Sequence, residues 1–175
     1  MKNHTKKLTT CAIFSAIICV VTTFVAVPAP AIGNINLGDI FILCSAWLLG
    51  PYGAVSAGIG ACLADLFSGY AIYAPATFVI KFIMAIVCYF SYVLLSKSIK
   101  HKFLCYLISA ILAEGVMVLG YFAYECLIYD FTLAFASIPF NLIQGSVCMV
   151  IGSLVIAILH KSPAVESFCK AFQKR

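Results

Sequence analysis

Long apolar stretches recur along this chain, and they constrain its fold more than any other feature of the sequence. Runs long enough, or nearly long enough, to cross a bilayer cover residues 8–27, 38–50, 52–69, 75–97, 103–127 and 135–160. A transmembrane helix needs about 20 apolar residues, and only 10% of the residues are charged. We therefore expect an all-α integral membrane protein, in which residues 1–175 form a single bundle of six transmembrane helices.

The boundary between the second and third runs is the least obvious one. Only the sequence "GPYG" at residues 50–53 separates them. Joined into one helix, the two runs would be too long for a single span. Because Pro51 stands between two glycines, a combination that breaks helices, we expect two short helices here.

Basic residues mark the expected orientation. The three connections at 28–36, 70–74 and 128–134 contain no Lys or Arg. Six spans with a cytoplasmic N-terminus place every basic cluster inside, as the positive-inside rule requires. Both termini are therefore expected in the cytoplasm, and this charge pattern points to a lipid bilayer and not to nucleic acid. The clusters consist of Lys2, Lys6 and Lys7; Lys97, Lys100 and Lys102; and Lys161, Lys170, Lys174 and Arg175.

The first run has a second interpretation, as a cleaved signal peptide. Basic residues precede this run, and "APA" at residues 29–31 follows it. The apolar region of a signal peptide has about 7–15 residues, and the run at 8–27 is longer. We therefore expect a retained helix.

The sequence offers little for catalysis or metal binding. Nine cysteines occur without any C-x-x-C pair, and the three histidines lie at or beyond helix ends. We expect no metal, no cofactor and no catalytic residue, and a Walker loop for ATP is missing. An intramembrane enzyme using Glu114 or Asp65 in acid–base chemistry is one alternative, and a structural membrane protein is another.

Polar side chains gather near the expected outer surface. Ionisable groups inside a membrane are expensive and need a partner or a function. Because several converge at one depth, we expect a polar cavity that opens outward, with aromatic walls. The residues expected to bind a substrate there are Asp39, Trp47, Asp65, Tyr70, Tyr73, Lys81, Asn141 and Gln144.

Asp65 and Lys81 stand on consecutive helices joined by a short turn, at similar depth. We expect the two side chains to approach each other, either as part of the cavity or as a purely structural pair. Glu125 and Asp130 are expected at the solvated outer rim. Glu114 lies deeper, where it could contact a substrate or only pack.

The segment "INLGDIFILCSAWLLGPYGAVSAGIGACLADLFSGYAIYAPATFVIKF" (35–82) resembles the substrate-binding S subunits of energy-coupling-factor (ECF) vitamin transporters. It is most similar to the subgroup that includes pyridoxine, hydroxymethylpyrimidine and riboflavin subunits. "AIFSA" in the first run also resembles the family's docking motif, which would assign Ala12 and Ala16 to partner docking.

This resemblance implies a multi-pass protein of a prokaryotic plasma membrane that is not itself an enzyme. Its partners would be a transmembrane T subunit and two ATPase subunits, which hydrolyse the ATP. The implied substrate is a small water-soluble vitamin or precursor, either vitamin B6 or hydroxymethylpyrimidine, with riboflavin as the alternative.

Overall fold

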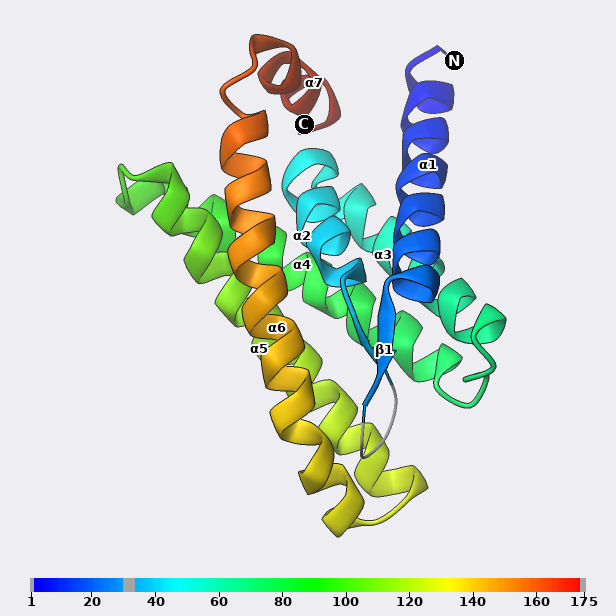
Figure 1. Cartoon of the computed structure of the whole chain (residues 1–175). Coiled ribbons are helices and arrows are strands. Elements are labelled where there is room, and N and C mark those ends of the chain that lie inside the picture. The colour runs from blue at the N-terminus through cyan, green and yellow to red at the C-terminus, as the bar shows by residue number, and fades with distance from the viewer. Residues whose placement is uncertain (1, 30–33, 174–175) are drawn as a thin grey trace.

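The computed structural model describes residues 2–29 and 34–173, and helices make up most of this part of the chain (Figure 1). Six helices follow the six apolar runs, with ends that differ from the expected ones by a few residues. The bounds are Lys2–Phe24 for α1, Gly38–Leu49 for α2, Pro51–Phe67 for α3, Ala74–Ser98 for α4, Lys102–Ile128 for α5 and Phe131–Leu159 for α6. A seventh helix, α7, covers Pro163–Gln173.

Four of these helices are long and apolar enough to cross a bilayer: α1 from Thr5 onward, α4, α5 and α6. The apolar helices α2 and α3 are shorter, with 12 and 17 residues. In Figure 1, the start of α1, the connection from α4 to α5, and α7 lie toward one end of the molecule. The turn from α5 to α6 lies at the opposite end. Six full spans with cytoplasmic termini remain a prediction, and this arrangement is compatible with it.

Helix α2 forms the centre of the bundle. Eleven of its 12 residues are buried, and it packs against α1, α3, α4, α6 and α7. Apart from Asp39 and Ser45, its sequence "GDIFILCSAWLL" is apolar on every side, as expected for a helix without a solvent or lipid face. Because α2 touches so many neighbours, it fixes their relative positions.

The break between α2 and α3 lies where the sequence predicts it. Gly50 has a φ of +63°, a conformation that residues with a Cβ rarely adopt, and Pro51 begins α3. A Cβ atom at Gly53 would collide with the backbone carbonyl of Ser45. A glycine at that position therefore lets α3 fold back closely against α2.

The segment that follows Phe24 differs from the expected helix. The first run ends as a helix at Phe24, and Ala26–Pro28 forms strand β1, antiparallel to β2 at Asn34–Asn36. The valines flanking Ala26 favour extended backbone, and Pro28 disfavours helix in the residue before it. The expected end of this helix at residue 27 is therefore wrong.

Helix α7 was not expected, because its sequence is amphipathic and lacks a long apolar run. Cys169 and Phe172 are buried, with 7% of each exposed. The ammonium group of Lys7 in α1 donates a hydrogen bond to the carbonyl oxygen of Phe172 at 3.3 Å. The apolar side of α7 thus packs on the bundle beside α1 and α2.

Candidate functional site

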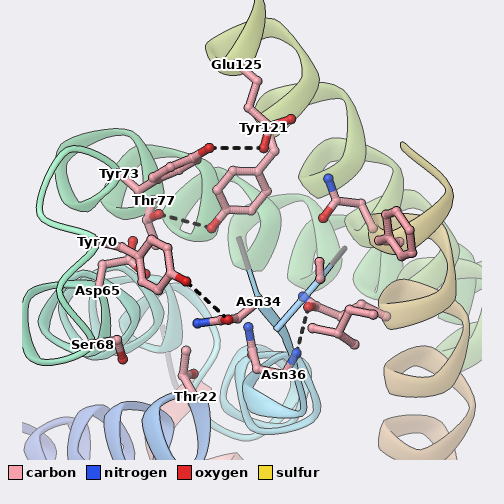
Figure 2. Close-up of a pocket in the computed structure, with 15 residues that line it drawn as sticks. Thr22, Asn34, Asn36, Asp65, Ser68, Tyr70, Tyr73, Thr77, Tyr121 and Glu125 are labelled. Carbon is pink, nitrogen blue, oxygen red and sulfur yellow. Dashed lines mark hydrogen bonds between the residues drawn. The ribbon is translucent and has the colours of Figure 1, made fainter. Parts of the chain in front are cut away.

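A cavity lies where the β hairpin meets the polar ends of the helices (Figure 2). Its empty volume is about 660 Å³, including the part that is open to solvent. Residues from α1, both sides of the hairpin, α3, α4, α5 and α6 contribute to its wall. The lining residues are Thr22, Ala29, Asn34, Ile35, Asn36, Asp65, Ser68, Tyr70, Tyr73, Thr77, Tyr121, Glu125, Phe140, Asn141 and Gln144.

Three tyrosines form an aromatic wall of this cavity. The ring centroid of Tyr73 lies 6.4 Å from that of Tyr70 and 6.4 Å from that of Tyr121. The Tyr70 hydroxyl donates to the side-chain oxygen of Asn34 at 3.4 Å, which ties the turn between α3 and α4 to the hairpin. Such a wall offers flat apolar faces with hydroxyl groups at their edges, which suits an aromatic ligand.

Glu125 lies beside Tyr73 and is buried, with 3% of the residue exposed. Its carboxylate accepts hydrogen bonds from the Tyr73 hydroxyl at 3.4 Å and from the Ser137 hydroxyl. The expectation of a solvated rim position was therefore wrong for Glu125, because α6 and the tyrosines cover it. Asp130 is exposed as expected, and it caps α6 by accepting from the backbone N–H of Leu133 at 2.9 Å.

Asp65 lines the cavity on the side of α3. Its Oδ2 atom is buried and has no hydrogen-bond partner among the described residues. The Thr77 side chain is close enough to interact with the carboxylate, and the Thr77 hydroxyl also shares a 3.1 Å hydrogen bond with the Tyr121 hydroxyl. Asp65 therefore brings acceptor capacity to the cavity that the described residues do not use fully.

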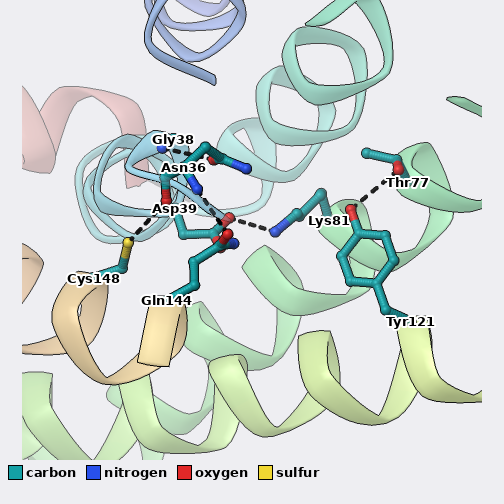
Figure 3. A network of polar contacts seen from close by, with 8 residues as sticks. All are labelled: Asn36, Gly38, Asp39, Thr77, Lys81, Tyr121, Gln144 and Cys148. Atoms are coloured by element: carbon teal, nitrogen blue, oxygen red, sulfur yellow. Dashed lines mark hydrogen bonds and ion pairs between the residues drawn. The ribbon is translucent and has the colours of Figure 1, made fainter. Parts of the chain in front are cut away.

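A second polar cluster, around Asp39 and Lys81, shares Asn36 and Gln144 with the lining of this cavity (Figure 3). The Lys81 ammonium is 2.5 Å from Oδ1 of Asp39, with 4% and 1% of the two side chains exposed. The Gln144 amide nitrogen donates to Oδ2 of Asp39 at 2.6 Å, and its amide oxygen accepts from the backbone N–H of Asn36 at 2.9 Å. Both oxygens of the Asp39 carboxylate are therefore occupied.

The expected pairing of Lys81 with Asp65 is therefore wrong. Asp39 lies in the first turn of α2, where the positive end of the helix dipole favours a carboxylate. Because α2 packs against α4, Lys81 can turn inward to reach it. The Lys81 ammonium lies 5.3 Å from the ring centroid of Tyr121, and neither Asp39 nor Lys81 lines the cavity.

Trp47, which was expected to bind a substrate, does not line this cavity. Trp47 follows Asp39 by eight residues, which is roughly 12 Å along a helix. Its indole N–H donates to the Ser109 hydroxyl at 3.1 Å, and its ring contacts Tyr106 edge-on at 5.2 Å. Asp39 and Trp47 lie near opposite ends of α2, so their polar groups contact different parts of the bundle.

The cavity thus collects five of the eight residues expected to bind a substrate: Asp65, Tyr70, Tyr73, Asn141 and Gln144. Sequence reasoning missed the hairpin residues Asn34 and Asn36, because it assigned no structure to that connection. It also missed Thr77 and Tyr121. A signal for Tyr121 was available, since it shares a helical face with Glu114, Met117 and Glu125, at steps of three and four residues.

Glu114 lies deeper in the bundle, away from the cavity. Only 5% of it is exposed, and neither carboxylate oxygen has a hydrogen-bond partner among the described residues. A Cβ atom at Gly145 would lie 3.2 Å from Oε2 of Glu114, so the glycine makes room for this carboxyl group. Glu114 packs between α5 and α6 and does not line the cavity.

Within residues 2–29 and 34–173, no group of three or more His, Cys, Asp or Glu side chains could hold a metal ion. The two alanines expected to dock a partner, Ala12 and Ala16, are exposed on α1. Their role in docking remains a prediction.

Residues 2–161 match the family model of the ECF-type riboflavin transporter, S component. The thiamine precursor transporter HmpT of Lactococcus lactis subsp. cremoris (strain MG1363) is 28% identical over 169 residues, covering 95% of each protein. An uncharacterized protein of Pyrococcus woesei is 33% identical over 146 residues, which cover 82% of this chain and 95% of that protein.

A solved structure of the S component of a bacterial ECF transporter also matches. Its TM-score is 0.69 at 25% identity, and the match covers 90% of this chain and 97% of that one. Family model and solved structure agree on a transporter subunit, which is not an enzyme. The chain belongs to the family of ECF-type riboflavin transporter S components, multi-pass membrane proteins of prokaryotes.

Proposed function

We propose that this protein is the substrate-binding S subunit of an ECF-type ABC transporter, and that the cavity beneath the hairpin holds its vitamin. The observation that carries the proposal is the cavity itself, where an aromatic wall and unused polar capacity meet. Ligand sites are mostly apolar, with a few polar groups that fix orientation. Tyr70, Tyr73 and Tyr121 supply the apolar faces, while Asp65, Asn141 and Gln144 supply polar groups.

The substrate we propose is hydroxymethylpyrimidine or a vitamin B6 compound, with riboflavin as the alternative. The similarity to the thiamine precursor transporter HmpT supports the pyrimidine. The family model supports riboflavin as the alternative. All three are flat heteroaromatic compounds with hydroxyl groups, which suits a wall of tyrosines.

The binding function can be tested on the purified protein. Equilibrium binding should be measured against a panel of water-soluble vitamins, and ligand that co-purifies should be identified by mass spectrometry. We expect one ligand with submicromolar affinity. If no vitamin binds and no ATPase complex co-purifies, the transport function is wrong.

The partners we propose are a T subunit and two ATPase subunits, with α1 as part of the docking face. Ala12 and Ala16 are one helical turn apart and exposed, so a partner helix could approach closely between them. Replacing both with leucine should prevent this approach, which abolishes uptake and co-purification of the partners. Vitamin binding by the isolated subunit should stay unchanged, and normal uptake by the double variant would disprove this docking face.

A further inference from the structure

We propose that Asp65 decides which ligands the cavity accepts, by binding a compound with a hydrogen-bond-donating ring edge and rejecting phosphorylated compounds. An amino group beside a nitrogen of a heteroaromatic ring provides such an edge. This inference rests on the proposed function and narrows its substrate to a chemical class. It arises from a difference among the carboxylates in and around the cavity.

Four carboxylates belong to this region, and two of them are already satisfied. Asp39 accepts from Lys81 and Gln144, and Glu125 accepts from Tyr73 and Ser137. Asp65 and Glu114 each have at least one carboxylate oxygen without a hydrogen-bond partner among the described residues, and of these two only Asp65 lines the cavity. Unsatisfied buried polar groups are rare in native structures and call for an explanation. A donor supplied by the ligand is such an explanation.

The position of Asp65 allows a ligand to reach this carboxylate. The residue lines the cavity together with Tyr70 and Thr77, and Figure 2 shows its side chain beside both of them. The terminal torsion of an aspartate is broad, so rotation of the carboxylate can present either oxygen to the cavity. A ring that packs against the tyrosines would therefore bring its edge to Asp65.

The charges in the cavity wall explain why we expect phosphorylated compounds to be rejected. Two of the lining residues are acids, Asp65 and Glu125, and none of the described lining residues is Lys, Arg or His. The nearest buried cation, Lys81, is engaged by Asp39 and lies behind Tyr121. A phosphate group would meet carboxylates without a counter-charge, whereas an amino group or a protonated ring nitrogen would meet favourable acceptors.

The test uses three compounds that differ only at the relevant groups. They are the amino-substituted hydroxymethylpyrimidine, its counterpart with a methoxy group in place of the amino group, and the phosphate ester of the first. Binding to the purified wild-type protein is measured by calorimetry. We expect the amino compound to bind at least tenfold more tightly than either of the others. The methoxy compound has no N–H group and places an ether oxygen against the Asp65 carboxylate.

Variants then assign the preference to one residue. Asp65→Asn should abolish the preference for the amino compound over the methoxy compound, because the amide can donate to the methoxy oxygen as well as accept. Asp65→Glu keeps the charge, and should keep the direction of the preference at lower affinity. Glu166→Gln removes a negative charge on the exposed side of α7 and should change no affinity.

The inference is wrong if the wild type binds the phosphate ester or the methoxy compound as tightly as the amino compound. It is also wrong if Asp65→Asn retains the full preference. A protein that binds none of the three but binds another vitamin of the panel would disprove the inference and leave the transport function standing. Binding of no vitamin at all, without an ATPase complex, disproves the proposed function itself.

Discussion

Asp39 and Asp65 are two aspartates in the same half of one bundle, yet the structure treats them in opposite ways. Asp39 has a lysine and an amide on its two oxygens and does not line the cavity. Asp65 lines the cavity with one oxygen unpartnered among the described residues. The difference teaches that a charge inside a membrane protein can serve the fold or be left available for a ligand. The following predictions test that division.

The largest effect is expected when the Asp39 cluster loses its cation. Lys81→Met leaves a buried carboxylate with only Gln144 as partner, and breaking a buried pair in this way costs about 3–5 kcal/mol. We expect low yield and a strongly lowered thermal unfolding temperature in detergent. Combining Lys81→Met with Asp39→Asn should recover most of the stability, and a single variant as stable as the wild type would contradict the assigned pair.

A smaller loss is expected at the amide that joins the Asp39 cluster to the hairpin. Gln144→Leu removes the donor to Asp39 and the acceptor for the backbone N–H of Asn36. Hydrogen bonds to charged groups contribute about 1.5–3 kcal/mol, so we expect a loss of stability in that range. Chemical unfolding measures it, and Gln144→Glu serves as the comparison because it keeps the acceptor for Asn36. Unchanged stability in Gln144→Leu would show that these two hydrogen bonds do not stabilise the fold.

Trp47, near the other end of α2 from Asp39, serves as a control because it contributes to stability without lining the cavity. Trp47→Phe removes the hydrogen bond to Ser109 and retains most of the contact with Tyr106. Loss of a neutral hydrogen bond should cost about 1 kcal/mol. Vitamin affinity should be unchanged, since Trp47 does not line the cavity. If Trp47→Phe lowers the vitamin affinity without changing the stability of the protein, Trp47 does take part in binding.

The smallest change in stability is expected at Asp65. Asp65→Asn removes a charge from a carboxylate that the described residues satisfy only in part, so its stability without ligand should remain within about 0.5 kcal/mol of the wild type or rise slightly. The measurement is thermal unfolding without ligand, beside Asp39→Asn. Equal destabilisation by both substitutions would contradict the proposal that Asp39 stabilises the fold whereas Asp65 is available to a ligand.

Much of the fold can be predicted from the sequence because lipid imposes a simple rule. Backbone polar groups in hydrocarbon must be satisfied within each segment, so long apolar runs become helices. The break at Pro51 follows from local backbone chemistry in the same way. Helix α7 and the hairpin escaped prediction, because both lie outside the long apolar runs and their short segments depend on neighbours for stability.

The residues of the candidate site likewise fall into those that the sequence predicts and those that it does not. Residues at a common depth can be read from their distance to helix ends, which is why Asp65, Tyr70, Tyr73, Asn141 and Gln144 were found together. Depth alone does not give the direction in which a side chain points or the helix it faces. For that reason sequence reasoning paired Lys81 with Asp65 and brought Trp47 into the site.

The sequence by itself therefore determined the six helices of the apolar runs, the break at Pro51 and the level at which the polar groups gather. Hydropathy and backbone restrictions act locally and leave their pattern in neighbouring residues. Only the tertiary structure decided which carboxylate receives Lys81, because that depends on the packing of α2 against α4 and α6. Contacts between residues 39, 81 and 144 join distant parts of the chain, and no local pattern records them.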